Sequence, residues 1–198
     1  MKRGPDKQFD RDEVLERAMH LFWRQGYEAT GMAELLAHMG IGRQSLYDTF
    51  GDKKSLFLAA LDRYIQAYIM PMTAALRAPG SPLGNVRRFL ELSAAMIAAG
   101  DHCGCLLGNT VAEMARTDPD VAARLGSLFS TGEATLATTI AQARAAGEVR
   151  SPLPDEDLAR MVIVAGQGLA LLTKLDAHRG WAESTIQSIL KVLEGYPR

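Results

Sequence analysis

TGMAELLAHMGIGRQSLYDTFGDK, residues 30–53, is the stretch that decides the fold of this chain. Apolar residues recur at helical spacing in its first half and predict a short helix with one apolar face: Met32, Leu35, Leu36 and Met39. Gly40 follows at once, where a glycine can take the positive φ that ends a helix and turns the chain. Ile41 is expected to fill that turn with an apolar side chain.

A second short helix is predicted over RQSLYDTF, residues 43–50. Leu46 and Phe50 lie four residues apart and can face the same core. The other hydrogen-bonding side chains are left to point outward: Arg43, Gln44, Ser45 and Tyr47. The second helix of a helix-turn-helix needs such a face in order to lie in a DNA major groove. A helical hairpin with a solvated polar face would show the same spacing.

The flanking sequence favours the DNA-binding interpretation, because residues 9–57 closely resemble the N-terminal domain of the TetR family of transcriptional repressors. The matching pieces are FDRDEVLERAMHLFWRQGYEAT, MAELLAHMGIGRQSLYDTF and GDKKSLF. The positions that fit the family pattern are Gly26, Tyr27, Thr30, Gly40, Leu46, Tyr47, Phe50 and Lys53. The resemblance implies a DNA-binding transcriptional regulator whose C-terminal helical domain binds an effector and dimerises.

Three positions depart from the family pattern, and all lie in or beside the helix expected to read DNA. Gly42 stands where Ser or Thr is usual, and Gln44 where a small residue is usual. Thr49 stands where an aromatic residue is common. These departures leave the operator sequence open without affecting the expected activity.

The residues expected to contact DNA divide into two sets. Four are assigned to phosphates: Thr30, Arg43, Tyr47 and Lys53. Gln44 and Ser45 are assigned to base edges, because a glutamine can pair bidentately with adenine. Thr30 is also a candidate N-cap for the helix that follows it, and the resemblance gives its hydroxyl a phosphate contact. Both roles can hold together.

Residues 1–8 carry three basic side chains against one aspartate, and Gly4-Pro5 opposes helix formation. Such a segment is either a disordered basic tail or an arm that contacts phosphates or the minor groove. We favour the arm, because the helix-turn-helix domain follows directly. The predicted domains are therefore residues 1–52, which bind DNA and include the arm, and residues 53–198, which bind an effector and dimerise.

The whole chain is predicted to be all-α, with about nine helices and no convincing alternation of the strand type. Asp10 is expected to cap the first helix, with Glu13 completing a capping box. Asp52 is expected to cap a long fourth helix that Pro71 must kink or end. Later helices are predicted to open at Ser81-Pro82 and at Asp118-Pro119, and to cover residues 155–177 and 181–193.

Composition sets limits on the class of protein. The 198 residues are 47% hydrophobic, which is ample for a buried core, and the formal net charge is −1. Contact with nucleic acid must therefore come from local clusters of basic residues. No apolar run reaches the length of a membrane span and residues 1–10 are polar, so a soluble cytoplasmic protein is expected.

The last two predicted helices carry more apolar surface than a solvated exterior needs. Leu172 and Leu190 are examples, and Gly166 and Gly168 would allow close helix approach. Some of these residues must form intramolecular core. The resemblance implies in addition that these two helices form a two-fold dimer, which would double the DNA contacts and set the half-site spacing.

No catalytic motif or phosphate-cradling glycine loop is found, so no enzyme and no cofactor are predicted. A small helical enzyme is the rival class. His102, Cys103 and Cys105 offer three soft metal ligands within four residues, but no second cluster supplies a fourth. Cys105 is otherwise a buried hydrophobe or a reactive thiol at a helix N-terminus. The segment GCLLGNTVAEMA resembles one at the sensor pocket of TetR-family members that answer electrophiles.

An effector pocket is expected in the C-terminal domain, since pockets are mostly apolar with a few directing polar groups. The side chains placed near it are Cys105, Asn109, Tyr64, Tyr68 and Gln167. Cys105 and Asn109 lie one helical turn apart, so a small ligand could meet both. The predicted function is a homodimeric repressor that a small molecule or an electrophile releases from a pseudo-palindromic operator. A metal-responsive regulator is the alternative use of the cysteine cluster.

Overall fold

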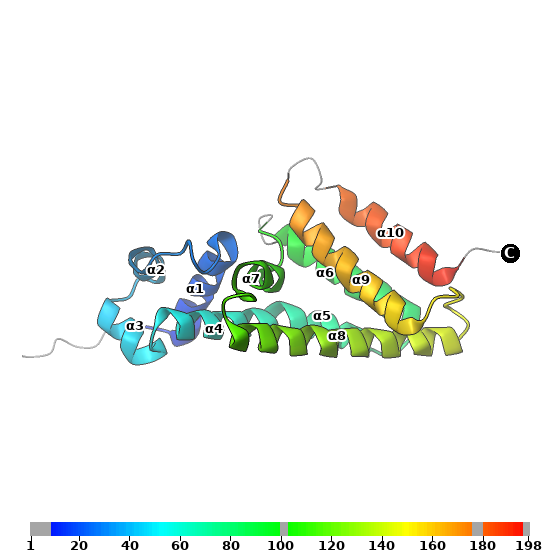
Figure 1. Cartoon of the computed structure of the whole chain (residues 1–198), viewed down its shortest axis with the longest axis horizontal. Helices are drawn as coiled ribbons and strands as arrows, with labels where there is room; N and C mark the ends of the chain where they lie inside the picture. The colour runs from blue at the N-terminus through cyan, green and yellow to red at the C-terminus, as the bar shows by residue number, and fades with distance from the viewer. Residues whose placement is uncertain (1–8, 100–102, 176–179, 196–198) are drawn as a thin grey trace, which may run out of the picture. The chain divides into compact units, whose positions relative to one another are not determined.

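The computed structural model describes residues 9–99, 103–175 and 180–195, which form helices and their connections (Figure 1). The first helices are α1 (Arg11–Gln25), α2 (Met32–Met39), α3 (Arg43–Phe50) and α4 (Lys53–Tyr64). A π-helical segment, η1 (Ile65–Ile69), leads into α5 (Met70–Ala75). The later helices are α6 (Pro82–Ala99), α7 (Leu106–Met114), α8 (Pro119–Ala145), α9 (Asp155–Leu172) and α10 (Trp181–Glu194).

The predicted all-α fold is confirmed. Because α4, η1 and α5 follow one another without a break, the described residues form nine continuous helical stretches and contain no strand. The predicted last pair of helices is present, although α9 ends at Leu172. Residues 176 and 177 of the longer predicted helix, the residues 1–8 of the predicted arm, Gly100 and His102 lie outside the described ranges.

Two compact units make up the chain, Met1–Gln66 and Ala67–Arg198. In packing, α4 belongs to the first unit because it lies along α1. The boundary predicted after residue 52 separates DNA binding from effector binding and dimerisation, and it stays a prediction.

Aromatic side chains hold the first unit together. Phe22 of α1 meets Phe57 of α4 edge-to-face, with ring centroids 5.0 Å apart. Trp23 meets Tyr64 in the same way at 4.9 Å. All four are buried, and edge-to-face pairs contribute about 0.5–1.5 kcal/mol beyond the area they bury. The contacts fix α1 against α4, so the two elements form a rigid base for the helix-turn-helix.

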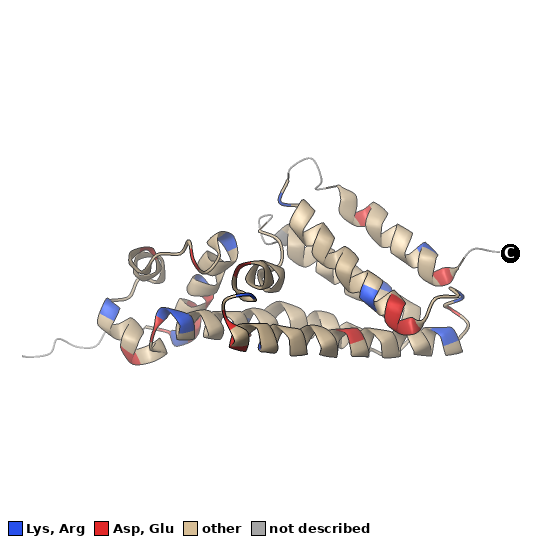
Figure 2. Cartoon of the chain, in the orientation of Figure 1, with Lys and Arg blue, Asp and Glu red and all other residues tan. Residues whose placement is uncertain are grey.

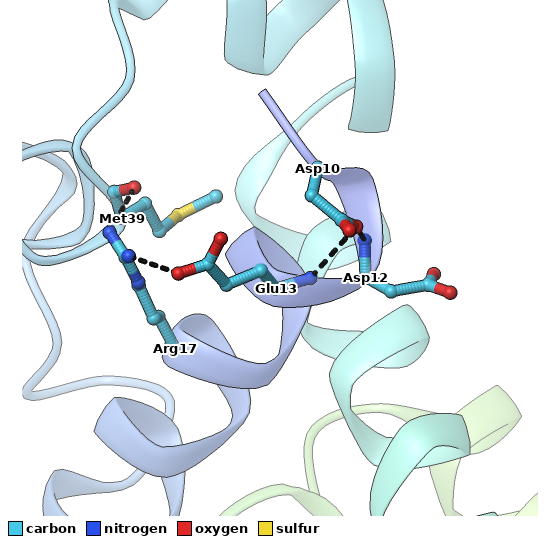
Figure 3. Close-up of polar contacts among 5 residues, drawn as sticks. All are labelled: Asp10, Asp12, Glu13, Arg17 and Met39. Atoms are coloured by element: carbon cyan, nitrogen blue, oxygen red, sulfur yellow. Dashed lines mark hydrogen bonds and ion pairs between the residues drawn. The ribbon is translucent and has the colours of Figure 1, made fainter. Parts of the chain in front are cut away.

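The turn between α2 and α3 forms as predicted. Gly40 has φ 71°, in the left-handed region, and its N–H donates to the carbonyl of Leu36 at 3.0 Å. Ile41 is half-buried and donates to the same carbonyl at 3.3 Å. The Arg17 guanidinium of α1 reaches across to the carbonyl of Met39 at 3.4 Å (Figure 3). One of the open carbonyl groups at the C-terminus of α2 therefore accepts its hydrogen bond from a side chain of another helix.

The predicted capping box of α1 is half wrong. Asp10 Oδ1 accepts from the backbone N–H of Asp12 at 2.8 Å and of Glu13 at 3.3 Å, which confirms the N-cap (Figure 3). The Glu13 carboxylate pairs instead with Arg17, one turn further along α1. A charged partner on the same exposed helix face outcompetes the neutral backbone N–H of the cap residue.

Thr30 is not the N-cap of α2, contrary to prediction. Gly31 occupies that position, and α2 begins at Met32. Thr30 is fully buried, and its hydroxyl donates to the carbonyl of Gly26 at 2.5 Å. The hydroxyl thus serves the C-terminal end of α1, and no side chain caps α2.

Pro71 has the predicted effect on the helix that contains it. Its nitrogen cannot donate to the carbonyl four residues earlier, and its ring would clash there. The residues before Pro71 accommodate it by forming the wider π-helical turns of Ile65–Ile69. Helix α5 then begins with Pro71 in its first turn.

The second unit is built around one apolar core shared by α6, α8, α9 and α10. Ser81 Oγ accepts from the N–H of Gly84 at 2.9 Å, which confirms the predicted start of α6. Asp118 Oδ1 accepts from the N–H of Val121 at 3.2 Å and starts α8 as predicted. Among the described residues, no helix is both long enough and apolar enough to cross a membrane.

The N-cap of α4 makes the stability of the protein depend on pH. The backbone N–H of Ser55 donates to Asp52 Oδ1 at 2.7 Å, and this bond holds the pKa of Asp52 below its ordinary value of 3.8. The cap therefore stabilises the folded state fully above that value and is lost as pH falls through the lower folded-state pKa.

We predict that Asp52→Ala lowers stability at neutral pH, and that the difference from wild type shrinks as pH falls below 3.8 and through the lower folded-state pKa of Asp52. Urea denaturation across that pH range measures it. Asp52→Asn is the matched control, because it keeps an acceptor without a titrating charge and should lose less stability. A difference between Asp52→Ala and wild type that stays constant with pH would contradict the role of the carboxylate.

Candidate nucleic-acid interface and ligand cavity

Helix α3 presents the buried and the exposed face that its spacing predicts. Leu46 and Phe50 are buried, while Arg43 and Gln44 are exposed. Tyr47 keeps 45% of its surface exposed although it is a large aromatic residue. Ser45 is half-buried at the edge of the polar face. The helix therefore offers a guanidinium, an amide and a phenol to a partner.

Gln44 has an intrahelical partner that the sequence analysis did not single out. Its Nε2 donates to Asp48 Oδ1 at 2.8 Å, one turn further along α3. The spacing of four residues between the two side chains was the available signal. One N–H and the carbonyl oxygen of the amide remain for a partner, which are the two groups that a bidentate contact with adenine uses.

The first turn of α3 is open to an anion. Gly42 is its N-cap in an extended conformation, and no side chain caps the helix there. The first backbone N–H groups of a helix, with the positive end of its dipole, attract phosphate. Figure 2 shows basic residues at the first turns of α3 and α4, where Arg43 and Lys53 stand.

Lys53 and Thr30 are held by neighbours within the first unit. The Lys53 ammonium lies over the ring of Tyr27, 4.4 Å from its centroid. The ring thus holds the ammonium at the start of α4. An exposed cation–π pair contributes only about 0.5–1 kcal/mol, so moving Lys53 to an outside partner such as a phosphate would cost little. Because Thr30 is buried, its contact with phosphate stays a prediction that requires local opening.

A cavity of about 80 Å³ lies within the second unit. It is lined by Ile69, Met72, Phe89, Leu90, Ser93, Met96, Ile97, Cys105, Val162, Ile163, Gly166, Gln167 and Ala170. Two residues predicted for an effector site meet here, because Gln167 Nε2 lies 3.8 Å from Cys105 Sγ. Ser93, Met72 of α5 and Met96 of α6 also line the cavity and were not predicted for the effector site. The helical spacing of Phe89, Ser93 and Met96 along α6 was the available signal.

The other three residues predicted for the effector site are not among those that line this cavity. Tyr64 lies in the aromatic core of the first unit. Tyr68 is half-buried. Asn109 bridges two elements of the second unit: its amide donates to the carbonyl of Cys103 at 2.9 Å and accepts from Lys174 Nζ at 2.7 Å. Asn109 thus ties the start of α7 to the end of α9.

An apolar stripe on α9 remains uncovered in the single chain. Val164 is 65% exposed and Leu171 is 62% exposed, and Leu172 at the end of the helix and Leu175 beyond it are exposed as well. Beyond Arg160 in its second turn, α9 carries no charged residue, and Figure 2 shows the rest of the helix in tan. Leu190, by contrast, is buried in the core of its own unit, so its predicted place at a dimer surface is wrong. The apolar face of α10 packs against the core of its own unit.

The cysteine cluster was the one candidate metal site in the sequence. Cys103 is half-buried, Cys105 is buried, and neither takes part in a disulfide. Within the described ranges, which exclude His102, no group of three potential ligands is assembled.

A helix-turn-helix unit followed along the chain by a helical unit with a cavity is an arrangement typical of DNA-binding transcriptional regulators. The family model described as "Bacterial regulatory proteins, tetR family" matches residues 14–60. The model described as "Tetracyclin repressor-like, C-terminal domain" matches residues 82–189. The chain belongs to the TetR family of transcriptional regulators.

Individual relatives agree with this assignment over nearly the whole chain. The uncharacterized HTH-type regulator YezE of Bacillus subtilis is 30% identical, over 96% of this chain and 100% of its own. The HTH-type transcriptional repressor ComR of Escherichia coli is 32% identical, over 85% and 81%. A cysteine mutant of the regulator CifR, solved with 26-base-pair operator DNA, superposes with a TM-score of 0.80 at 26% identity, over 98% and 100%. Homodimers and small-molecule effectors are typical of the family.

Proposed function

We propose that this protein is a repressor that binds an operator as a homodimer and leaves it when a small molecule occupies the second unit. The observation that carries the proposal is the exposed polar face of α3 on a helix whose opposite face is fully buried. Two relatives support it, since ComR is named a repressor and CifR was solved with operator DNA. The relatives named here are regulators and lend no support to an enzyme or to a metal-responsive protein.

The proposed DNA contacts are supported by the geometry of α3 and of the start of α4. Arg43, Tyr47 and Lys53, with the open N-terminus of α3, would hold phosphates and set the register. Gln44, tethered by Asp48, would read a base edge with its remaining N–H and carbonyl. Ser45 stands beside it as a second base contact. Thr30 would join the phosphate contacts once its hydroxyl is released from Gly26.

A dimer would bring two such helices to the DNA. The uncovered stripe on α9 supplies apolar surface that packing against its own unit does not use. A two-fold arrangement would place the two α3 helices in successive major grooves, about 34–36 Å apart, and so require a pseudo-palindromic operator.

Release of the operator would be a shift between conformations of the dimer. The ligand favours a spacing of the two α3 helices that does not fit the DNA, and its differential affinity for the two states limits the size of the effect. Cys105 and Gln167 are the residues we place at the effector site, because both line the cavity. Asn109, Tyr64 and Tyr68 are not placed there. Cys105 either contacts the effector or adds to an electrophilic one.

We predict that Gln44→Ala relaxes the preference for one base pair in each half-site, at a cost in discrimination of about 1–3 kcal/mol. Lys53→Ala should weaken binding to all sequences and reduce the slope of affinity against salt by about one for each subunit. Titrations of operator and scrambled DNA at several salt concentrations measure both effects. Arg88→Ala, an exposed change on α6, is the control. Unchanged affinity and preference in Gln44→Ala would show that the placement of α3 is wrong.

We predict that Val164→Glu combined with Leu171→Glu gives folded monomers without specific DNA binding, because two charges would be buried at the dimer face. Light scattering gives the mass, and circular dichroism shows that the helices persist. Ala141→Glu with Ala145→Glu on the exposed surface of α8 is the matched control and should stay dimeric. A wild-type protein that is monomeric at micromolar concentration would refute the dimer.

We predict that a small thiol-reactive electrophile releases the DNA complex of wild type and of Cys103→Ser, and not that of Cys105→Ser. The thiolate of Cys105 would form the bond to carbon inside the cavity, whereas Cys103 does not line it. Fluorescence anisotropy of labelled operator measures release. Release that persists in Cys105→Ser would remove this cysteine from the mechanism, and no release in any form would leave a non-covalent effector.

A further inference from the structure

The cavity of the second unit restricts the charge of what it can hold. None of the thirteen described residues that line it is Asp, Glu, Lys, Arg or His. Its walls are mostly aliphatic or aromatic, and Leu90, Val162 and Ala170 are buried. An ion that left water for this site would lose its hydration without gaining a partner of opposite charge. The cavity therefore selects uncharged molecules.

Its volume restricts the size of the ligand. A dry apolar cavity of about 150 Å³ accepts benzene, which has six carbon atoms. The cavity here measures about 80 Å³, close to half of that. Scaled by volume, it takes a molecule of about three or four non-hydrogen atoms.

Two polar side chains restrict the functional group. The Ser93 hydroxyl lies 2.8 Å from the carbonyl of Phe89 and 2.8 Å from Met72 Sδ. These two acceptors share its one proton, so Ser93 has only lone pairs to offer a ligand. Gln167 spends one N–H on Cys105 Sγ and keeps the second. The amide oxygen of Gln167 also packs closely against Gly108, where an added Cβ would lie 2.4 Å from Gln167 Oε1. The Gln167 side chain therefore has little room to move on that side. Gln167 is thus placed to donate one hydrogen bond to a ligand carbonyl.

We infer that the cavity binds a compact, uncharged carbonyl compound of about three or four non-hydrogen atoms, held by Gln167 in a space that Met72 and Met96 also line. This assignment names the class of effector and so rests on the proposed function, but the binding itself can be measured without DNA. Few atoms limit affinity, so millimolar dissociation constants are expected.

Gly166 provides a variant at the wall of the cavity that does not distort the fold. It lines the cavity in the middle of α9, and a Cβ built there meets no atom within 4 Å. We expect the methyl group of Gly166→Ala to narrow the cavity from this wall. Gly132 of α8 also has open space at its Cβ and does not line the cavity, so Gly132→Ala is the matched control.

The experiment follows the methyl signals of Met72 and Met96 by NMR in the full-length protein, with the remaining methionines as internal reference. Acetone is the probe, and acetate, with the same shape and a negative charge, is its control. Cyclohexanone tests the size limit. Acetone should shift both methyl signals saturably, acetate should not, and cyclohexanone should bind at least tenfold more weakly.

The variants test the location. Gly166→Ala should weaken acetone binding at least tenfold while raising the melting temperature by about 2–4 °C, since alanine favours a helix over glycine. Gly132→Ala should show the same rise and unchanged binding. Met96→Ala should enlarge the cavity and admit cyclohexanone.

Equal binding of acetate, equal binding of cyclohexanone to wild type, unchanged binding in Gly166→Ala, or no saturable acetone shift would each overturn the inference. Acetone binding that leaves the operator complex intact would uphold the inference about the cavity. That outcome would count against the proposed release mechanism alone.

Discussion

The edge-to-face packing of α1 on α4 is the contact on which the DNA-binding unit depends. Phe22 with Phe57 and Trp23 with Tyr64 fill the space between two helices that are far apart in sequence. Helices of eight residues such as α2 and α3 are too short to be stable alone in water. They exist because Leu35, Met39 and Leu46 are buried in this unit.

Burial on one side of α3 also decides what its other side can do. Once Leu46 and Phe50 face inward, the 3.6-residue period sends Arg43, Gln44 and Tyr47 outward. The tether between Gln44 and Asp48 then limits the rotamers of the amide before any partner arrives. A side chain that is already ordered loses less entropy on binding, so less of the binding free energy is lost to ordering it.

Helix α9 serves three surfaces in the second unit. Leu158 and Val162 join the core, Gly166 and Gln167 line the cavity, and Val164 with Leu171 stays uncovered. A ligand in the cavity would therefore touch the same helix that carries the uncovered stripe. Under the proposed function, α9 is the element through which the two sites could be coupled, if it has two arrangements that each site can favour.

Several features of this protein are determined by local sequence alone. The turn at Gly40, the caps Asp10, Asp52 and Ser81, and the interruption at Pro71 were predictable, because each depends on residues within one or two turns. The two-faced spacing of α3 was predictable for the same reason. The resemblance of residues 9–57 to the TetR family then gave the class of function, which the comparisons confirmed.

Only the tertiary structure decided the partners of side chains that local rules leave open. Thr30 bonds to the end of α1 instead of capping α2, and Glu13 turns to Arg17. Tyr64, predicted to lie near the effector cavity, and Leu190, predicted to lie at the dimer surface, are both buried in the core of their own units. Gln167 and Cys105, sixty-two residues apart, meet at one cavity. Helical periodicity fixes which residues share a face, but which neighbour covers that face depends on contacts distant in sequence, and those exist only in the folded chain.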